Sequence, residues 1–183
     1  MKELYSERLY LRPFRGSDQE DLFRLYGNAE VMAIRKIGTQ SRTGSDRQLE
    51  IILDHWHRRG FGLWAVFDRK NGDFLGECGL REENMKGAEA SREVELSYGL
   101  IPAGWGRGLA TEAADLMICW GFEELGLPAI QAFARSDNAA SLHILRKLGF
   151  IYESDFPEDG YRISRTCLKQ VDWLKTAGKV PVR

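Results

Sequence analysis

The sequence predicts a single mixed α/β (α+β) domain that spans residues 1–183. The order of the expected elements carries this prediction: antiparallel strands come first, one strand-helix-strand crossover follows, and a pair of strands ends the chain. A chain of 183 residues is long enough to bury a core without disulfides, and it is an ordinary length for one domain. A doubly wound parallel sheet is not predicted, because it would need several crossovers.

The first sixty residues predict a strand and two helices. Over residues 8–14, Leu9, Leu11 and Pro13 alternate with Tyr10, Arg12 and Phe14, which is typical of a strand that ends or lies at an edge near the proline. Ser17, with Glu20 three residues later, has the pattern of a helix capping box. Apolar residues recur at helical spacing over residues 47–59 and a glycine follows, so we expect a second helix there. The polar stretch over residues 35–46 is expected to be a loop.

The middle of the chain predicts three antiparallel strands. Residues 62–67 and 74–80 flank an Asn-Gly dipeptide, which is favoured in tight hairpin turns. A polar connection over residues 83–91 leads to residues 92–100, where apolar and polar positions alternate. The proline two residues further on is expected to end this third strand.

The last part of the chain predicts the crossover and the closing strands. An amphipathic helix begins at Leu109, and a strand over residues 129–134 follows it. A right-handed crossover should make this strand parallel to the one at residues 92–100. The remaining expected elements are a helix, a strand pair and a short helix, at residues 139–148, 150–152 with 161–168, and 170–175.

The composition fits a globular protein and excludes several classes of function. The net charge is −1, so no global basic surface points to nucleic acid. No apolar run approaches the ~20 residues that span a bilayer, and the N-terminus carries no apolar signal segment. The three cysteines are far apart, which favours a reducing, cytoplasmic setting. No histidines or cysteines have ligand spacing, so we expect no metal.

The most informative stretch is the glycine-rich turn at residues 104–108, immediately before the helix that begins at Leu109. Such a turn gathers backbone N–H groups at a helix N-terminus, where the helix dipole favours a phosphate. A P-loop is excluded, because no Gly-Lys-Ser or Gly-Lys-Thr is present. A dinucleotide-binding fingerprint fails, because Thr111 stands where the third glycine belongs. A plain loop before a helix is the remaining alternative.

A longer set of motifs resembles the GNAT acyltransferases. ERLYLRPF, RLYGNAEVM, WGRGLATEA and NAASLHILRKLGF occur in this order between Glu7 and Phe150, and they resemble the branch that contains the RimJ/RimL ribosomal-protein N-terminal acetyltransferases. The resemblance implies acetyl-CoA as donor and an amine as acceptor. It also implies a GNAT-like fold, in which helices flank a central twisted mixed sheet that is splayed between the strands at residues 93–100 and 129–134. The pantetheine arm of coenzyme A would lie in that splay.

The resemblance also implies which residues bind coenzyme A. The family turn is written [QR]-x-x-G-x-[GA], and Trp105 replaces the usual Gln or Arg. Arg107 is a candidate for direct phosphate contact, with a solvated loop arginine as the alternative. A backbone N–H near Leu100 is expected to bind the oxyanion, and Asn138 is expected to contact the cofactor as well as to cap a helix. The backbone cradle of the turn comprises Gly106, Arg107, Gly108, Ala110 and Thr111.

Acetyl transfer also needs a base for the amine and an acid for the leaving thiolate. Glu95 is the first candidate base: it either accepts the proton, directly or through a water, or it faces solvent as an ordinary strand residue. Glu93 and Glu77 are weaker candidates. The tyrosine that many family members use as the acid is replaced by Leu145 here. The resemblance implies Ser141 as the acid instead, with a small packing residue as the alternative.

Two classes of acceptor remain as alternatives: a peptide N-terminus and a small-molecule amine. The cations of the expected loop, Arg35, Lys36 and Arg42, favour an acidic or carboxylate-bearing acceptor over a polycation, unless they form only a solvated surface. We expect no nucleic-acid or membrane partner, and either a monomer or a homodimer. The competing hypothesis is a non-catalytic acyl-CoA-binding sensor or interaction module.

Overall fold

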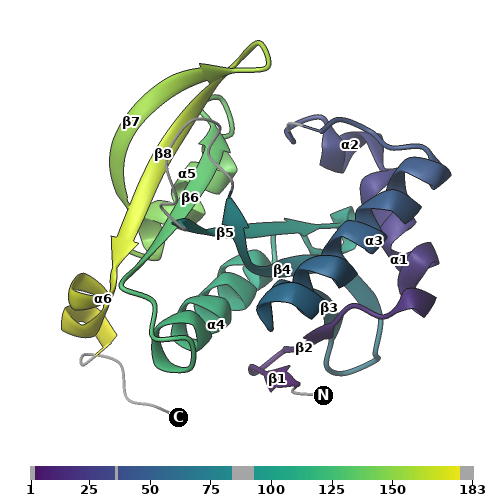
Figure 1. Cartoon of the computed structure of the whole chain (residues 1–183), viewed down its shortest axis with the longest axis horizontal. Helices are drawn as coiled ribbons and strands as arrows, with labels where there is room; N and C mark the ends of the chain where they lie inside the picture. Colours follow the sequence, from purple (N-terminus) through teal and green to yellow (C-terminus); the bar gives the residue numbers. More distant parts are fainter. Residues whose placement is uncertain (1–2, 36, 84–92, 178–183) are drawn as a thin grey trace. The chain divides into compact units, whose positions relative to one another are not determined.

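The computed structural model describes residues 3–35, 37–83 and 93–177, and over these residues the mixed α/β prediction is confirmed (Figure 1). Their eight strands hydrogen-bond in the order β1-β2-β3-β4-β5-β6-β8-β7, with flanking helices. The strands are β1 (Leu4–Tyr5), β2 (Leu9–Pro13), β3 (Leu63–Asp68), β4 (Phe74–Glu83), β5 (Glu93–Leu100), β6 (Ala129–Arg135), β7 (Ile151–Glu158) and β8 (Tyr161–Lys169). The helices are α1 (Gln19–Tyr26), α2 (Ala29–Met32), α3 (Arg42–Arg59), α4 (Leu109–Glu123), α5 (Ala139–Lys147) and α6 (Gln170–Ala177).

Contacts group the chain into two compact units, which are described in turn. The first contains Met1–Arg81 and Ser97–Met117, and the second contains Glu82–Leu96 and Ile118–Arg183. Within the described part of the chain, no helix is long and apolar enough to cross a membrane.

In the first unit, β1 to β4 pair in sequence as antiparallel neighbours. The predicted alternation of β2 is confirmed, because Leu9 and Leu11 are completely buried. The hairpin between β3 and β4 is also confirmed, and Gly72 in its turn has φ of 77°. A left-handed backbone of this kind is why an Asn-Gly dipeptide marks the turn in the sequence.

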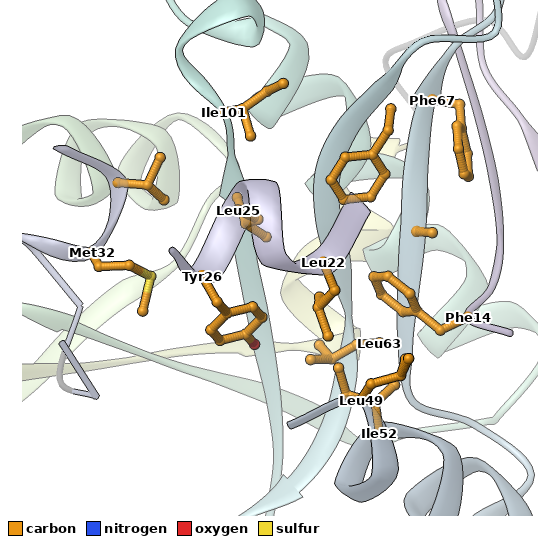
Figure 2. Close-up of a cluster of buried hydrophobic side chains, with 13 residues drawn as sticks. Phe14, Leu22, Leu25, Tyr26, Met32, Leu49, Ile52, Leu63, Phe67 and Ile101 are labelled. Carbon is orange, nitrogen blue, oxygen red and sulfur yellow. The ribbon is translucent and has the colours of Figure 1, made fainter. Parts of the chain in front are cut away.

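The core of the first unit lies where α1, α2 and α3 pack on these strands (Figure 2). The helix predicted over residues 47–59 begins earlier, at Arg42, because the Ser41 hydroxyl caps it by accepting from the Gly44 N–H at 3.1 Å. The loop predicted over residues 35–46 is therefore wrong for its last five residues. The buried core side chains are Phe14, Leu22, Leu25, Tyr26, Val31, Met32, Leu49, Ile52, Leu63, Ala65, Phe67, Phe74 and Ile101.

The capping box predicted at Ser17 is wrong. A short 3-10 helix, Gly16–Asp18, precedes α1, and the Asp18 carboxylate accepts from the Arg15 backbone N–H at 2.8 Å. The same carboxylate forms an ion pair with Arg12 at 2.6 Å. Because the Asp18 carboxylate already accepts a backbone N–H at the start of these helices, a serine cap at Ser17 is not needed. The four-residue helix α2 was not predicted; the side chain of Asn28 caps it.

In the second unit, the predicted parallel crossover is confirmed, since β5 and β6 run parallel with Glu95 opposite Gln131. The closing strand pair is confirmed too, and β7 is longer than predicted. Asp159 and Gly160 at its turn have φ of 47° and 81°, the pair of left-handed residues that a tight hairpin needs. Most of the connection predicted over residues 83–91 lies outside the described residues, and Lys36 does so as well.

Candidate functional site

The glycine-rich turn between β5 and α4 has the backbone shape of an anion cradle. Gly106 and Gly108 have φ of 68° and 75°, a region in which a side chain would be strained. A Cβ added at Gly106 would meet no atom within 4 Å, so the space beside this backbone is open. The Glu112 N–H donates to the Gly108 carbonyl at 3.1 Å, which starts α4. The N–H groups of its first turn therefore lie directly after the glycines, without helical acceptors.

A network from the N-terminal strand region braces this turn. The Glu112 carboxylate accepts from the Arg8 backbone N–H at 2.8 Å and from the Ser6 hydroxyl at 2.7 Å. The Arg8 guanidinium binds the same carboxylate and also donates to the Arg107 carbonyl at 2.8 Å. Burial alone would raise the pKa of Glu112, but these hydrogen bonds lower it below its ordinary value. Glu112 is therefore an anion that is already neutralised by its partners.

The side chains of Arg107 and Trp105 make further hydrogen bonds that hold the turn. The Arg107 guanidinium pairs with Asp68 at 3.2 Å and donates to the Ala103 carbonyl at 3.2 Å. It is half exposed, so its direct contact with phosphate stays a prediction. The Trp105 indole Nε1 donates to the Leu100 carbonyl at 2.6 Å. Tryptophan in the place of Gln or Arg thus ties the turn to the end of β5.

The first unit also holds a buried ion pair that the sequence did not reveal. Glu77 in β4 is completely buried and accepts from the Arg35 Nη2 at 2.6 Å. The Tyr26 hydroxyl donates to the same carboxylate, at 3.0 and 3.1 Å from its two oxygens. Burial and the charge of Glu77 both raise the pKa of Tyr26, so this hydroxyl stays a neutral donor. Glu77 is therefore placed as an ion-pair partner, which gives no support to it as a base.

In the second unit, Glu95 is only 6% exposed, so the alternative of a solvent-facing strand residue is wrong. Burying a carboxylate is costly, and such groups concentrate at functional sites. The neighbouring candidate Glu93 forms an ion pair with Arg165 at 2.8 Å, and Arg165 also binds Glu153. Glu93 is therefore placed as an ion-pair partner, and Glu95 stays the first candidate for the base because of its burial.

The start of α5 carries the two remaining predicted residues. The Asn138 side-chain oxygen accepts from the Ser141 backbone N–H at 3.0 Å, which confirms that Asn138 caps the helix. Ser141 lies in the first turn of α5 and is partly buried. Leu145, at the family's tyrosine position, is 2% exposed and belongs to the core.

The histidines that stand close together in the sequence do not form a metal site. His55 uses its Nδ1 to hydrogen-bond the Phe61 carbonyl at 2.8 Å. Among the residues that the structure describes, no group of three or more His, Cys, Asp or Glu side chains is placed to hold a metal.

Two solved structures share this fold. The ribosomal-protein-S5-alanine acetyltransferase of Vibrio fischeri aligns with a TM-score of 0.76 at 18% identity, over 94% of this chain and 99% of its own. The spermidine N-acetyltransferase of Vibrio cholerae, solved with CoA and spermine, aligns with a TM-score of 0.76 at 20% identity, over 92% and 99%. These identities support the fold alone.

Two relatives found by sequence have higher identity to this chain than these two structures. The uncharacterized N-acetyltransferase YoaA of Bacillus subtilis is 30% identical over 80% of this chain and 81% of its own length. The spermidine N(1)-acetyltransferase of Escherichia coli is 31% identical over 92% and 91%. The family model for the acetyltransferase (GNAT) domain matches residues 8–151, so the resemblance seen in the sequence is confirmed. The chain belongs to the GNAT family of N-acetyltransferases.

Proposed function

We propose that this acyltransferase moves the acetyl group of acetyl-CoA to a primary amine by direct attack within a ternary complex. The observation that carries the proposal is the turn directly before α4, in which Gly106 and Gly108 are left-handed and the space beside Gly106 is open. We assign the coenzyme A pyrophosphate to the backbone of this turn. Its cradle comprises Gly106, Arg107, Gly108, Ala110 and Thr111.

Glu95 is proposed as the base that prepares the amine, directly or through a water. Its burial supports this role, because buried carboxylates concentrate at functional sites. An α-amine titrates near ~7.7–8.0 and a lysine-like amine near ~10.4. An acceptor of the second kind would therefore depend more strongly on Glu95.

The other groups would act on the thioester. We propose that a backbone N–H near Leu100 binds the developing oxyanion and that Ser141 donates a proton to the leaving thiolate. Asn138 would contact the pantetheine arm or the adenosine side of the cofactor with its amide, while its side-chain oxygen caps α5. Leu145 has no proton to give, which is why the acid must come from another residue.

The acceptor is proposed to be either a protein N-terminus or a small-molecule amine. The Escherichia coli relative named as a spermidine N(1)-acetyltransferase, 31% identical to this chain, supports the small-molecule class. We also propose a cytoplasmic location, which is supported by Cys78, Cys119 and Cys167, since none of the three is in a disulfide.

The test is release of free thiol from acetyl-CoA in the presence of a panel of amines and short peptides. The Glu95→Gln variant should lose about 10²- to 10⁴-fold in kcat/KM at neutral pH, and the deficit should shrink as the pH approaches the pKa of the amine. Ser141→Ala should lower kcat more than it raises KM. Glu123→Gln, at an exposed position of α4, is the matched control and should behave as wild type.

The competing function, a non-catalytic acyl-CoA-binding module, predicts a different pattern. In that case the protein binds CoA, but no acceptor in the panel gives turnover. If turnover occurs and Glu95→Gln and Ser141→Ala leave it unchanged, the enzyme stands and the assignment of these two residues is wrong.

A further inference from the structure

Arg35 has a guanidinium group that its protein partners use only in part. Arg35 follows α2, and its backbone N–H donates to the Met32 carbonyl at 3.1 Å. Its Nη2 binds Glu77, whereas its Nη1 is buried and has no hydrogen-bond partner. A buried donor without a partner is destabilising and calls for an explanation.

The backbone of β5 is shaped to admit this guanidinium. A Cβ added at Gly99 would lie 2.9 Å from the Arg35 Nη1 and 3.1 Å from its Cζ, so a larger residue at this position would displace the group. The side chain of Arg35 is 18% exposed although its Nη1 is itself buried, so the guanidinium lies just below the surface. Gly99 is therefore the residue that lets a positive charge lie against the end of β5.

The guanidinium is fixed in position and always charged. The buried Glu77 holds its Nη2, and the ring of Tyr26 lies 5.4 Å from its Cζ. Burial by itself would lower the pKa of Arg35, but the charge of Glu77 raises it above its ordinary value. A planar, charged fork with one side held by the protein is suited to bind a carboxylate with its other side.

The place of this donor along β5 indicates which ligand it would meet. Gly99 is the neighbour of Leu100, where we propose that the acetyl carbonyl is bound. The turn assigned to the pyrophosphate begins several residues later along the chain, at Gly104. An anion on Arg35 is therefore expected to belong to the acceptor rather than to coenzyme A.

Two other arginines of the first unit have carboxylate partners for their guanidinium groups. Arg42 pairs with Glu20 and Asp46 on the surface. Arg12 pairs with Asp18. The partial pairing of Arg35 therefore distinguishes it from these two arginines.

We propose that Arg35 binds a carboxylate of the amine acceptor, so that the preferred substrates are amines that carry a carboxylate and not polyamines. This inference rests on the proposed acetyltransfer and adds the class of acceptor to it. Glu77 and Tyr26 act as positioning residues, which hold the guanidinium over Gly99. The carboxylate can come from a free amino acid or peptide terminus, or from an acidic side chain of a peptide.

The test compares matched acceptors that differ only in the carboxylate. Ser-Gly and Ser-Gly-amide probe a terminal carboxylate, Ser-Asp-amide and Ser-Asn-amide probe a side-chain carboxylate, and spermidine represents a polycation. Wild type should prefer the carboxylate member of at least one pair by about 10- to 100-fold in kcat/KM, the size expected of a charge-assisted hydrogen bond. The pair with the larger ratio identifies the source of the carboxylate.

Arg35→Lys should reduce this preference towards one, chiefly through KM. Because removal of the fork could also loosen the fold, Gly99→Ala provides a second variant, in which the guanidinium is displaced and every charge is kept. Arg58→Gln, an exposed arginine at the end of α3, is the control and should keep the wild-type ratio. The ratio between two acceptors is measured within one variant, so general loss of folded protein cannot change it.

Several outcomes would overturn the inference. Equal rates for both members of both pairs, or faster turnover of spermidine than of any carboxylate, would contradict it while leaving acetyltransfer intact. An unchanged preference in both Arg35→Lys and Gly99→Ala would do the same. If no amine is acetylated, calorimetric binding of N-acetyl-Ser-Gly against its amide decides separately: stronger binding of the carboxylate supports Arg35, and equal binding contradicts it.

Discussion

The Arg35–Glu77 pair should contribute strongly to stability, and its two halves should contribute unequally. Arg35→Met leaves the Glu77 carboxylate completely buried, with the Tyr26 hydroxyl as its remaining partner among the contacts described above. Glu77→Leu leaves the Arg35 guanidinium on a side chain that is 18% exposed, so the charge can turn towards water. Breaking a buried pair typically costs about 3–5 kcal/mol. We therefore expect a loss near ~5 kcal/mol for Arg35→Met and near ~3 kcal/mol for Glu77→Leu.

The double variant Arg35→Met/Glu77→Leu should recover most of this loss, because apolar residues of similar volume can replace a buried pair at little cost. Urea unfolding at 25 °C measures the free energy of unfolding of all three variants against wild type. Each kcal/mol should also shift Tm by roughly 2–4 °C in a chain of this size. The reasoning is refuted if each single variant loses less than about 1 kcal/mol, or if the double variant loses the sum of the two.

Three further predictions follow from the same contacts. The lowered pKa of Glu112 stabilises the fold above the ordinary carboxyl pKa of 4.5, and this contribution is lost as the pH falls through the lower pKa of the folded state. Urea midpoints between pH 7 and pH 3 should therefore fall less steeply in Glu112→Gln than in wild type. Burial and the charge of Glu77 raise the pKa of the fully buried Cys78, so iodoacetamide at pH 8 should modify this thiol only after unfolding, as mass spectrometry can show. Trp105→Phe removes the hydrogen bond to Leu100 and should cost about 0.5–1.5 kcal/mol in urea unfolding, together with a measurable loss of CoA affinity by calorimetry; an unchanged affinity would contradict the role of the indole.

Short sequence patterns were sufficient to predict the glycine-rich turn, the β3–β4 hairpin and the parallel crossover. The glycines before an amphipathic helix predicted a turn that brings bare backbone to the helix N-terminus, and Gly106 and Gly108 there both have positive φ. The Asn-Gly dipeptide predicted the β3–β4 hairpin for the same reason. The parallel crossover to β6 followed from the handedness of strand-helix-strand units. These features depend on residues that are near one another in the chain.

The contacts that the sequence did not reveal join distant residues. Arg35 and Glu77 are 42 positions apart, and Arg8 and Glu112 are 104 apart, so no local pattern marks them. The failure at Ser17 has a different cause, because the contacts there are local: Asp18, and not Ser17, binds the Arg15 N–H and the Arg12 guanidinium. Glu95 also required the structure, since alternation along a strand does not decide whether a face meets solvent or protein.

Binding of CoA to two matched glycine variants tests the central claim most directly. Gly106 and Gly72 have φ of 68° and 77°, and an added Cβ at either would meet no atom within 4 Å. Alanine should therefore cost each site a similar ~1–2 kcal/mol of backbone strain. If the turn at Gly106 holds the pyrophosphate, calorimetry should show at least a tenfold weaker CoA affinity for Gly106→Ala and an unchanged affinity for Gly72→Ala. Equal CoA affinities in the two variants would contradict the account.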